Sequence, residues 1–193
     1  PGQARVALNV ALFGGAGDAP LEDAQVTFAN NVATTAHQMG ASTAPGQYSL
    51  QLGAGTVGQV NVSRAHDSAT DPSITATDAL QALRLAVGMD PTWGEADGFD
   101  FIAADINGNG QVNATDALEI LRTLPDSSVS HTADNQPEWV FGERGMDFTG
   151  VDNGNVPTGL DGQFDLAAIN DNTDLQIQGL LLGNMENYWA LVS

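Results

Sequence analysis

The hydrophobic residues of the first 65 positions occur at or near every second position in four short segments. This spacing is the period of a β-strand with one buried face. A glycine-rich turn at residues 14–18 separates the first two segments, and further turns follow. Short strands joined by turns predict a small antiparallel β-sandwich for residues 1–65. Its apolar positions are Val6, Leu8, Val10 and Leu12, then Ala24, Val26 and Phe28, then Tyr48, Leu50 and Leu52, and last Val57, Val60 and Val62.

Two later segments change to the helical period of about 3.6 residues. Gly88 ends the first predicted helix, and Pro125 follows the second. We expect one face of each helix to lie against a core. The residues of these faces are Ala79, Leu80, Leu83, Ala86 and Val87 in the first helix, and Leu118, Leu121 and Leu124 in the second.

The last third of the chain contains two further apolar runs, at residues 138–141 and 175–182, which predict strands. The expected fold class is therefore α+β: an N-terminal antiparallel β-sandwich, a pair of helices and a C-terminal β-rich extension. The expected domain boundaries are 1–65, 66–125 and 126–193, with the extension packing on the helical part.

Charge separates the first part of the chain from the rest. The 193 residues include 24 acidic residues, five arginines, no lysine and no cysteine, for a net charge of −19. Residues 1–65 have a net charge of −1, so the remaining segment has −18. Such acidity excludes a nucleic-acid binder with a basic surface. We also expect no membrane insertion. Because many carboxylates repel one another, the acidic part is expected to bind cations.

An internal repeat lies in the acidic part. Residues 73–84 match residues 111–122 at an offset of 38 positions, and Ala-Thr-Asp-Ala-Leu and Leu-Arg recur without change. A recurring unit of this length indicates a duplicated supersecondary motif.

The second copy contains a twelve-residue loop of the EF type, from Asp105 to Asp116. Oxygen-bearing residues stand at the odd positions, which point inward in such a loop, and Gly110 stands at the sharp bend. The alternative is an Asn/Gly turn that only caps a helix. The predicted calcium ligands are Asp105, Asn107, Asn109, the Gln111 carbonyl, Asn113 and Asp116.

The first copy is a degenerate version of the same loop. Ala69 stands at a ligand position, and Pro72 replaces the glycine. We expect a weaker second calcium ion here, with a vestigial loop as the alternative. The candidate ligands are Asp67, Asp71, Ser73, Thr75 and Asp78.

These two loop–helix units resemble the dockerin family over residues 67–124. The resemblance implies two calcium ions, near two-fold symmetry and a cohesin-type partner bound through a helix face. The family's recognition positions fall on Ala76, Thr77 and Arg84 in the first copy, and on Ala114, Thr115 and Arg122 in the second. Their identity implies that two binding orientations are possible. A capping role for the two arginines is the alternative.

Residues 20–56 resemble the carboxypeptidase regulatory-like, or prealbumin-like, β-sandwich, which implies a spacer domain of extracellular proteins. The segment shows no catalytic motif, and the three histidines of the chain stand alone. We therefore expect a non-catalytic, secreted or cell-surface docking module of a larger protein. One alternative is a calcium-stabilised terminal region of an adhesin with the repeats docked intramolecularly, and another is a carbohydrate-binding module. A third metal site within residues 147–174, for example around Asp161 and Asp165, stays open.

Overall fold

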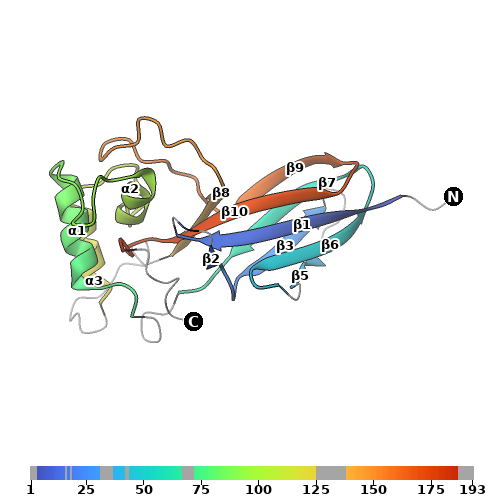
Figure 1. The fold of residues 1–193 in the computed structure, drawn as a ribbon, viewed down its shortest axis with the longest axis horizontal. Helices are drawn as coiled ribbons and strands as arrows, with labels where there is room; N and C mark the ends of the chain where they lie inside the picture. The colour runs from blue at the N-terminus through green and yellow to red at the C-terminus, as the bar shows by residue number, and fades with distance from the viewer. Residues whose placement is uncertain are drawn as a thin grey trace. The chain divides into compact units, whose positions relative to one another are not determined.

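The computed structural model describes residues 4–15, 17, 19–30, 37–41, 44–66, 72–124 and 138–186 (Figure 1). Along the chain, short strands come before and after a helical segment, which confirms the predicted α+β class. The elements, in chain order, are β1 (Arg5–Gly14), β2 (Ala19–Pro20), β3 (Gln25–Asn30), β4 (His37–Gln38), β5 (Gly40–Ala41), β6 (Gln47–Gly53), β7 (Thr56–Ser63), α1 (Ala76–Ala86), α2 (Gly98–Ala104), α3 (Ala114–Arg122), β8 (Trp139–Glu143), β9 (Gln163–Ile169) and β10 (Thr173–Leu181).

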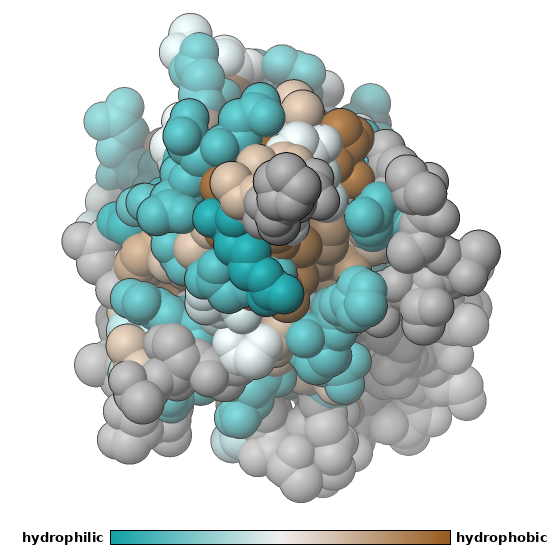
Figure 2. All heavy atoms as spheres, turned by 90° about the vertical axis from the view of Figure 1, so that its right-hand side faces the viewer, coloured by the Kyte–Doolittle hydropathy of each residue, from teal (hydrophilic) through white to brown (hydrophobic). Residues whose placement is uncertain are grey.

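The strands form two sheets, one with the order β5-β6-β1-β10-β8 and β2 paired to β1, the other with the order β4-β3-β7-β9. The predicted alternation along the N-terminal strands is present: Leu8, Val10 and Leu12 are at most 1% exposed, as are Val26 and Phe28. The residues between them are half-buried, and hydrophilic residues alternate with apolar ones over the coloured surface in Figure 2.

The C-terminal strands belong to these same sheets. β10 pairs in parallel with β1 over seven residues, from Leu8 opposite Thr173 to Gly14 opposite Gly179. β9 pairs antiparallel with β7. Parallel neighbours need a long crossover connection, and residues 15–172, which lie between β1 and β10 in the chain, provide it.

The chain therefore divides into two compact units whose limits differ from the expected domain boundaries. The first unit, the strand unit, contains residues 1–64, 140–145 and 160–179, and the second, the repeat unit, contains the rest. The segment 126–193, expected to pack on the repeats as one extension, is thus divided between the two units. Whether 1–65, 66–125 and 126–193 fold as separate domains stays a prediction.

The buried faces of α1 and α3 differ from the predicted ones. The buried apolar residues are Ala79, Ala82 and Leu85 in α1, and Ala117 and Ile120 in α3. The prediction that these apolar faces lie against the core holds for Ala79 and is wrong for five other residues, because the side of each helix turned inward carries Ala82 and Leu85 in α1 and Ala117 and Ile120 in α3. Ala86 and Leu124 are half-buried. The five exposed residues are Leu80 54%, Leu83 41%, Val87 65%, Leu118 46% and Leu121 43%.

Candidate calcium loops and docking face

The second loop begins where α2 ends, at Asp105, and closes at the first turn of α3. The Asp105 carboxylate accepts hydrogen bonds from the Asn109 N–H (3.1 Å) and the Gly110 N–H (2.8 Å). Gly110 has φ +85°, a left-handed conformation that favours glycine. These bonds bend the loop around the Asp105 side chain.

The far end of the loop returns to its beginning. The Asp116 carboxylate accepts from the Asn107 Nδ2 (2.7 Å) through one oxygen and from the Asn113 N–H (2.9 Å) through the other. Asn113 caps α3 and completes a capping box with Asp116. The predicted ligands Asp105, Asn107, Asn113 and Asp116 are thereby linked in one small network.

Two carboxylates in this loop are buried without a cationic side chain. Asp116 is 0% and Asp105 3% exposed. Burial and then the charge of Asp105 are the main causes that raise the pKa of Asp116 to about 6, and burial also raises the pKa of Asp105. A divalent cation would relieve both the desolvation and the repulsion.

The oxygen chemistry of the loop fits calcium, which prefers carboxylate, amide and carbonyl oxygens. Within the described residues, no group of three or more histidine, cysteine or acidic side chains is placed to hold a metal. The loop thus offers two carboxylates, and its other oxygens come from Asn107, Asn109, Asn113 and the backbone. Gln111 is exposed and Val112 is buried, as expected for a loop held to the core by its eighth residue.

The first loop is described only in part, because Asp67 and Asp71 lie outside the described residues. Ser73 is half-buried. Thr75 caps α1 and donates from its N–H and its hydroxyl to Asp78, each at 2.7 Å. Asp78 is 1% exposed, so the closing acid of both copies is buried at a helix N-terminus.

A segment outside the repeats bonds to the second loop, although no periodic pattern in its residues predicts this role. The Val112 N–H donates to the Asn153 carbonyl (2.8 Å), and the Val156 N–H donates to the Gly110 carbonyl (3.0 Å). The Asn153 side chain also donates to the Leu85 carbonyl at the end of α1 (3.2 Å). Residues 153–156 therefore act as a short backbone partner of the loop.

The predicted recognition residues lie at the exposed starts of two helices that pack together. Ala76, Thr77, Ala114 and Thr115 are all exposed. The exposed leucines of α1 and α3 are related by the same offset of 38 residues, Leu80 with Leu118 and Leu83 with Leu121. We call these residues, with the two arginines, the docking face: Ala76, Thr77, Leu80, Leu83 and Arg84 from α1, and Ala114, Thr115, Leu118, Leu121 and Arg122 from α3.

Both arginines of the docking face are half-buried and have partners. The Arg84 Nε donates to the Asp90 carbonyl (2.8 Å). Arg122 forms an ion pair with the buried Glu119, at 2.5 Å. Each guanidinium thus helps to fix its own repeat and also has donors left for another group.

Acidic side chains within residues 147–174 accept hydrogen bonds from nearby backbone N–H groups or from a neighbouring strand. Asp147 accepts from the Thr149 N–H, and Asp161 from the Gln163 N–H (2.9 and 3.0 Å). Asp165 accepts from the Gln59 side chain of the adjacent strand (2.9 Å). The open possibility of a third metal site around Asp161 and Asp165 receives no support from these contacts.

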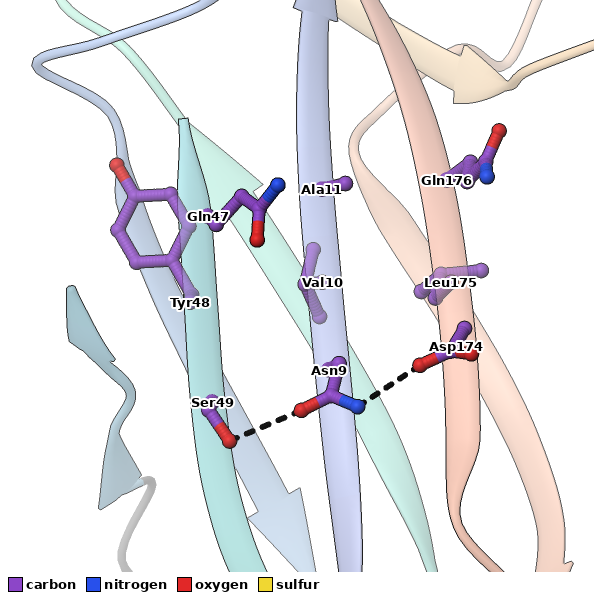
Figure 3. Close-up of a pocket in the computed structure, with 9 residues that line it drawn as sticks. All are labelled: Asn9, Val10, Ala11, Gln47, Tyr48, Ser49, Asp174, Leu175 and Gln176. Carbon is purple, nitrogen blue, oxygen red and sulfur yellow. Dashed lines mark hydrogen bonds between the residues drawn. The ribbon is translucent and has the colours of Figure 1, made fainter. Parts of the chain in front are cut away.

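A shallow groove of about 400 Å³ crosses β6, β1 and β10 on the strand unit. Figure 3 shows its polar ladder: the Ser49 hydroxyl donates to Asn9 (3.0 Å), and the Asn9 amide donates to Asp174 (2.8 Å). Tyr48 is the aromatic residue of the lining, but it is 8% exposed and its hydroxyl donates to the Ala24 carbonyl. The groove therefore offers no aromatic platform on which a sugar ring could stack.

The described helices include none that is long and apolar enough to cross a membrane.

Searches of curated proteins and of solved structures gave no match. Residues 65–125, however, match the family model of the dockerin type I domain. The β-sheet regions that flank the match have no identified family. A dockerin type I domain is a non-catalytic module that typically binds calcium and docks onto a cohesin, usually within cellulosome-type secreted proteins, so the match over residues 65–125 implies a calcium-binding docking module in this part of the chain.

Proposed function

We propose that the chain is a non-catalytic, calcium-binding part of a larger secreted protein and attaches that protein to a cohesin-type partner through the docking face. The observation that carries this proposal is the exposure of repeat-related leucines, Leu80 with Leu118 and Leu83 with Leu121. On each helix the two leucines are three residues apart and therefore lie on the same side, and adjacent exposed apolar side chains mark an interaction site.

The duplicated composition of the docking face supports two binding orientations. Each helix offers the same alanine, threonine, two leucines and arginine at equivalent positions. A partner that recognises one set can therefore recognise the other after a rotation that exchanges α1 and α3.

A calcium ion in the second loop would stabilise the part of the docking face that lies on α3. Asp105 and Asp116 would hold the ion with oxygens of Asn107, Asn109, Asn113 and the Gln111 backbone. Because Asp116 lies in the first turn of α3, a bound ion would fix the start of the helix that presents Thr115 and Leu118. The second loop is the stronger candidate, because the first has Ala69 at a ligand position and Pro72 in place of the glycine.

Binding to a panel of type I cohesin modules tests the docking face. Thr77→Asp and Thr115→Asp replace exposed first-turn residues, where an acid suits the helix dipole and folding is preserved. Each single variant should keep binding through the other set, and the double variant should lose roughly 100-fold in affinity. Val57→Ser, at an exposed valine of β7, is the control. Full binding by the double variant would refute the assignment.

A second candidate function is supported by the backbone bonds from residues 153–156 to the second loop. In this alternative, the repeats are a calcium-stabilised structural part of a surface protein and have no separate partner. Calcium-dependent melting without binding to any cohesin would favour it, whereas cohesin binding through the docking face would exclude it.

A further inference from the structure

Asp78, the closing acid of the first loop, has every acceptor position filled by protein donors. One carboxylate oxygen accepts from the Thr75 N–H and hydroxyl, both at 2.7 Å. The other accepts from the Met185 N–H at 2.6 Å and the Glu186 N–H at 3.2 Å. A carboxylate offers about four lone-pair sites, so these four bonds leave none for a metal.

The two distant donors belong to a turn, residues 183–186, that follows β10 and that we call the C-terminal turn. Gly183 donates to the Ala103 carbonyl at 2.7 Å and has φ +87°. A Cβ on Gly183 would lie 3.2 Å from Ile106 and 3.3 Å from Ile74, so only glycine fits here without a shift. Met185 is 0% exposed. The turn is thus seated in the interior of the repeat unit.

Asp116, the equivalent acid of the second loop, has a different set of partners. Its corresponding oxygen accepts from the Asn107 side chain, which can rotate and present its own oxygen to a shared cation. The N–H groups of Met185 and Glu186 belong to the backbone and cannot exchange a donor for an acceptor. They direct partial positive charge at the oxygen that a calcium ion would need.

We propose that the C-terminal turn replaces calcium in the first repeat: two backbone N–H groups hold Asp78 in the place where an ion holds Asp116. The chain then binds one calcium ion, in the second loop. The missing ligand at Ala69 and the proline at position 72 agree with a loop that no longer needs to enclose an ion. The stoichiometry rests on the calcium site proposed above, whereas the clamp on Asp78 does not.

Amide hydrogen exchange in the full chain, with EDTA present, tests the clamp directly. The Met185 and Glu186 amides should be protected without any metal. Asp78→Asn should speed their exchange at least tenfold, since the charge that strengthens both bonds is lost. The matched variant Asp116→Asn should leave it unchanged. Free exchange of both amides in the wild-type chain in EDTA would overturn the proposal, and this measurement needs no variant to fold.

Calcium titration of the full chain, followed by native mass spectrometry, tests the stoichiometry. We expect one ion in the wild-type chain and in Asp78→Asn, and none in Asp116→Asn. Two ions in the wild-type chain, falling to one in Asp78→Asn, would overturn the replacement. No ion in any form would refute the proposed second-loop site, while protected Met185 and Glu186 amides in EDTA would still support the clamp.

Discussion

Three acids of the repeat unit, Asp78, Asp100 and Asp116, occupy the same local position. Each is the third residue of a helix, is at most 4% exposed and closes a capping box with the residue before the helix. Capping bonds of this kind contribute about 1 kcal/mol each. Two of these acids close the repeated loops, while Asp100 caps α2 and also accepts a hydrogen bond from the Trp93 side chain.

Asp100 makes the stability of the chain depend on pH. Burial, and secondarily the charge of Asp97, raises its pKa to about 6 from an ordinary 3.8. The folded state therefore holds this proton more tightly than the unfolded state, so stability rises as pH falls from about 7 towards about 4. Asp100→Asn keeps an acceptor for the Asp97 N–H and removes the titration.

We expect Asp100→Asn to be more stable than the wild-type chain at pH 7.5, by on the order of 1–3 kcal/mol. The difference should vanish near pH 4. Urea unfolding of both proteins across this range measures it. A difference that is independent of pH would contradict the role assigned to Asp100.

Asn184 is a buried side chain of the described repeat unit whose polar atoms make no hydrogen bonds. It is 1% exposed, and neither its amide oxygen nor its amide nitrogen has a hydrogen-bond partner. Asn184→Leu, which keeps the branched side chain of four heavy atoms without its polar groups, should raise stability by about 1–3 kcal/mol. Thermal melting of this variant, with the exposed Asn170→Leu as control, provides the test. A melting temperature below that of the wild-type chain would contradict the prediction.

The second loop depends on the backbone conformation of a single glycine. Gly110 has φ +85°, and a Cβ there would lie 3.4 Å from the Thr158 side chain. Gly110→Ala should therefore destabilise the chain by about 1–2 kcal/mol. Gly40→Ala, where the added carbon meets nothing within 4 Å, is the control. Chemical unfolding with and without calcium measures both, and equal stability of the two variants would contradict the prediction.

The elements of the repeats could be predicted from the sequence because their signals are local. The Thr-x-x-Asp and Asn-x-x-Asp boxes fix the starts of α1 and α3, and Gly110 fixes the bend of the loop. The orientation of the helices could not be predicted, since leucine and alanine both follow the helical period. The alanines Ala79 and Ala82 are buried, and Leu80 and Leu83 are left for the docking face. In the sequence, the apolar pattern of a helix face that is exposed for binding looks the same as the pattern of a buried face.

Strand pairing across the whole molecule could not be predicted from the sequence. The apolar run at residues 175–182 predicts a strand, which is present as β10, but its partner lies more than 150 residues earlier, at Leu8 to Gly14. Strand pairing over such a distance leaves no local pattern, because the alternation of a strand shows which face is buried but does not identify its neighbours.

The shared sheets predict how an N-terminal fragment behaves. Residues 1–65 alone lack β9 and β10, so β1 and β7 each become unpaired at one edge. Exposed apolar edge strands aggregate. We expect this fragment to be insoluble or to unfold without cooperativity, as judged by circular dichroism and light scattering. A monomeric fragment with a sharp melting transition would instead establish residues 1–65 as an independent domain.

The parallel pairing of β1 and β10 has a mechanical consequence. The two strands run in the same direction, so Arg5 and Leu181 lie at opposite ends of the pair. A pull on the chain through these two ends loads the seven-residue register in shear, and its hydrogen bonds must break together instead of one after another. Tension applied between these two ends would therefore meet the combined resistance of all the hydrogen bonds of the pair.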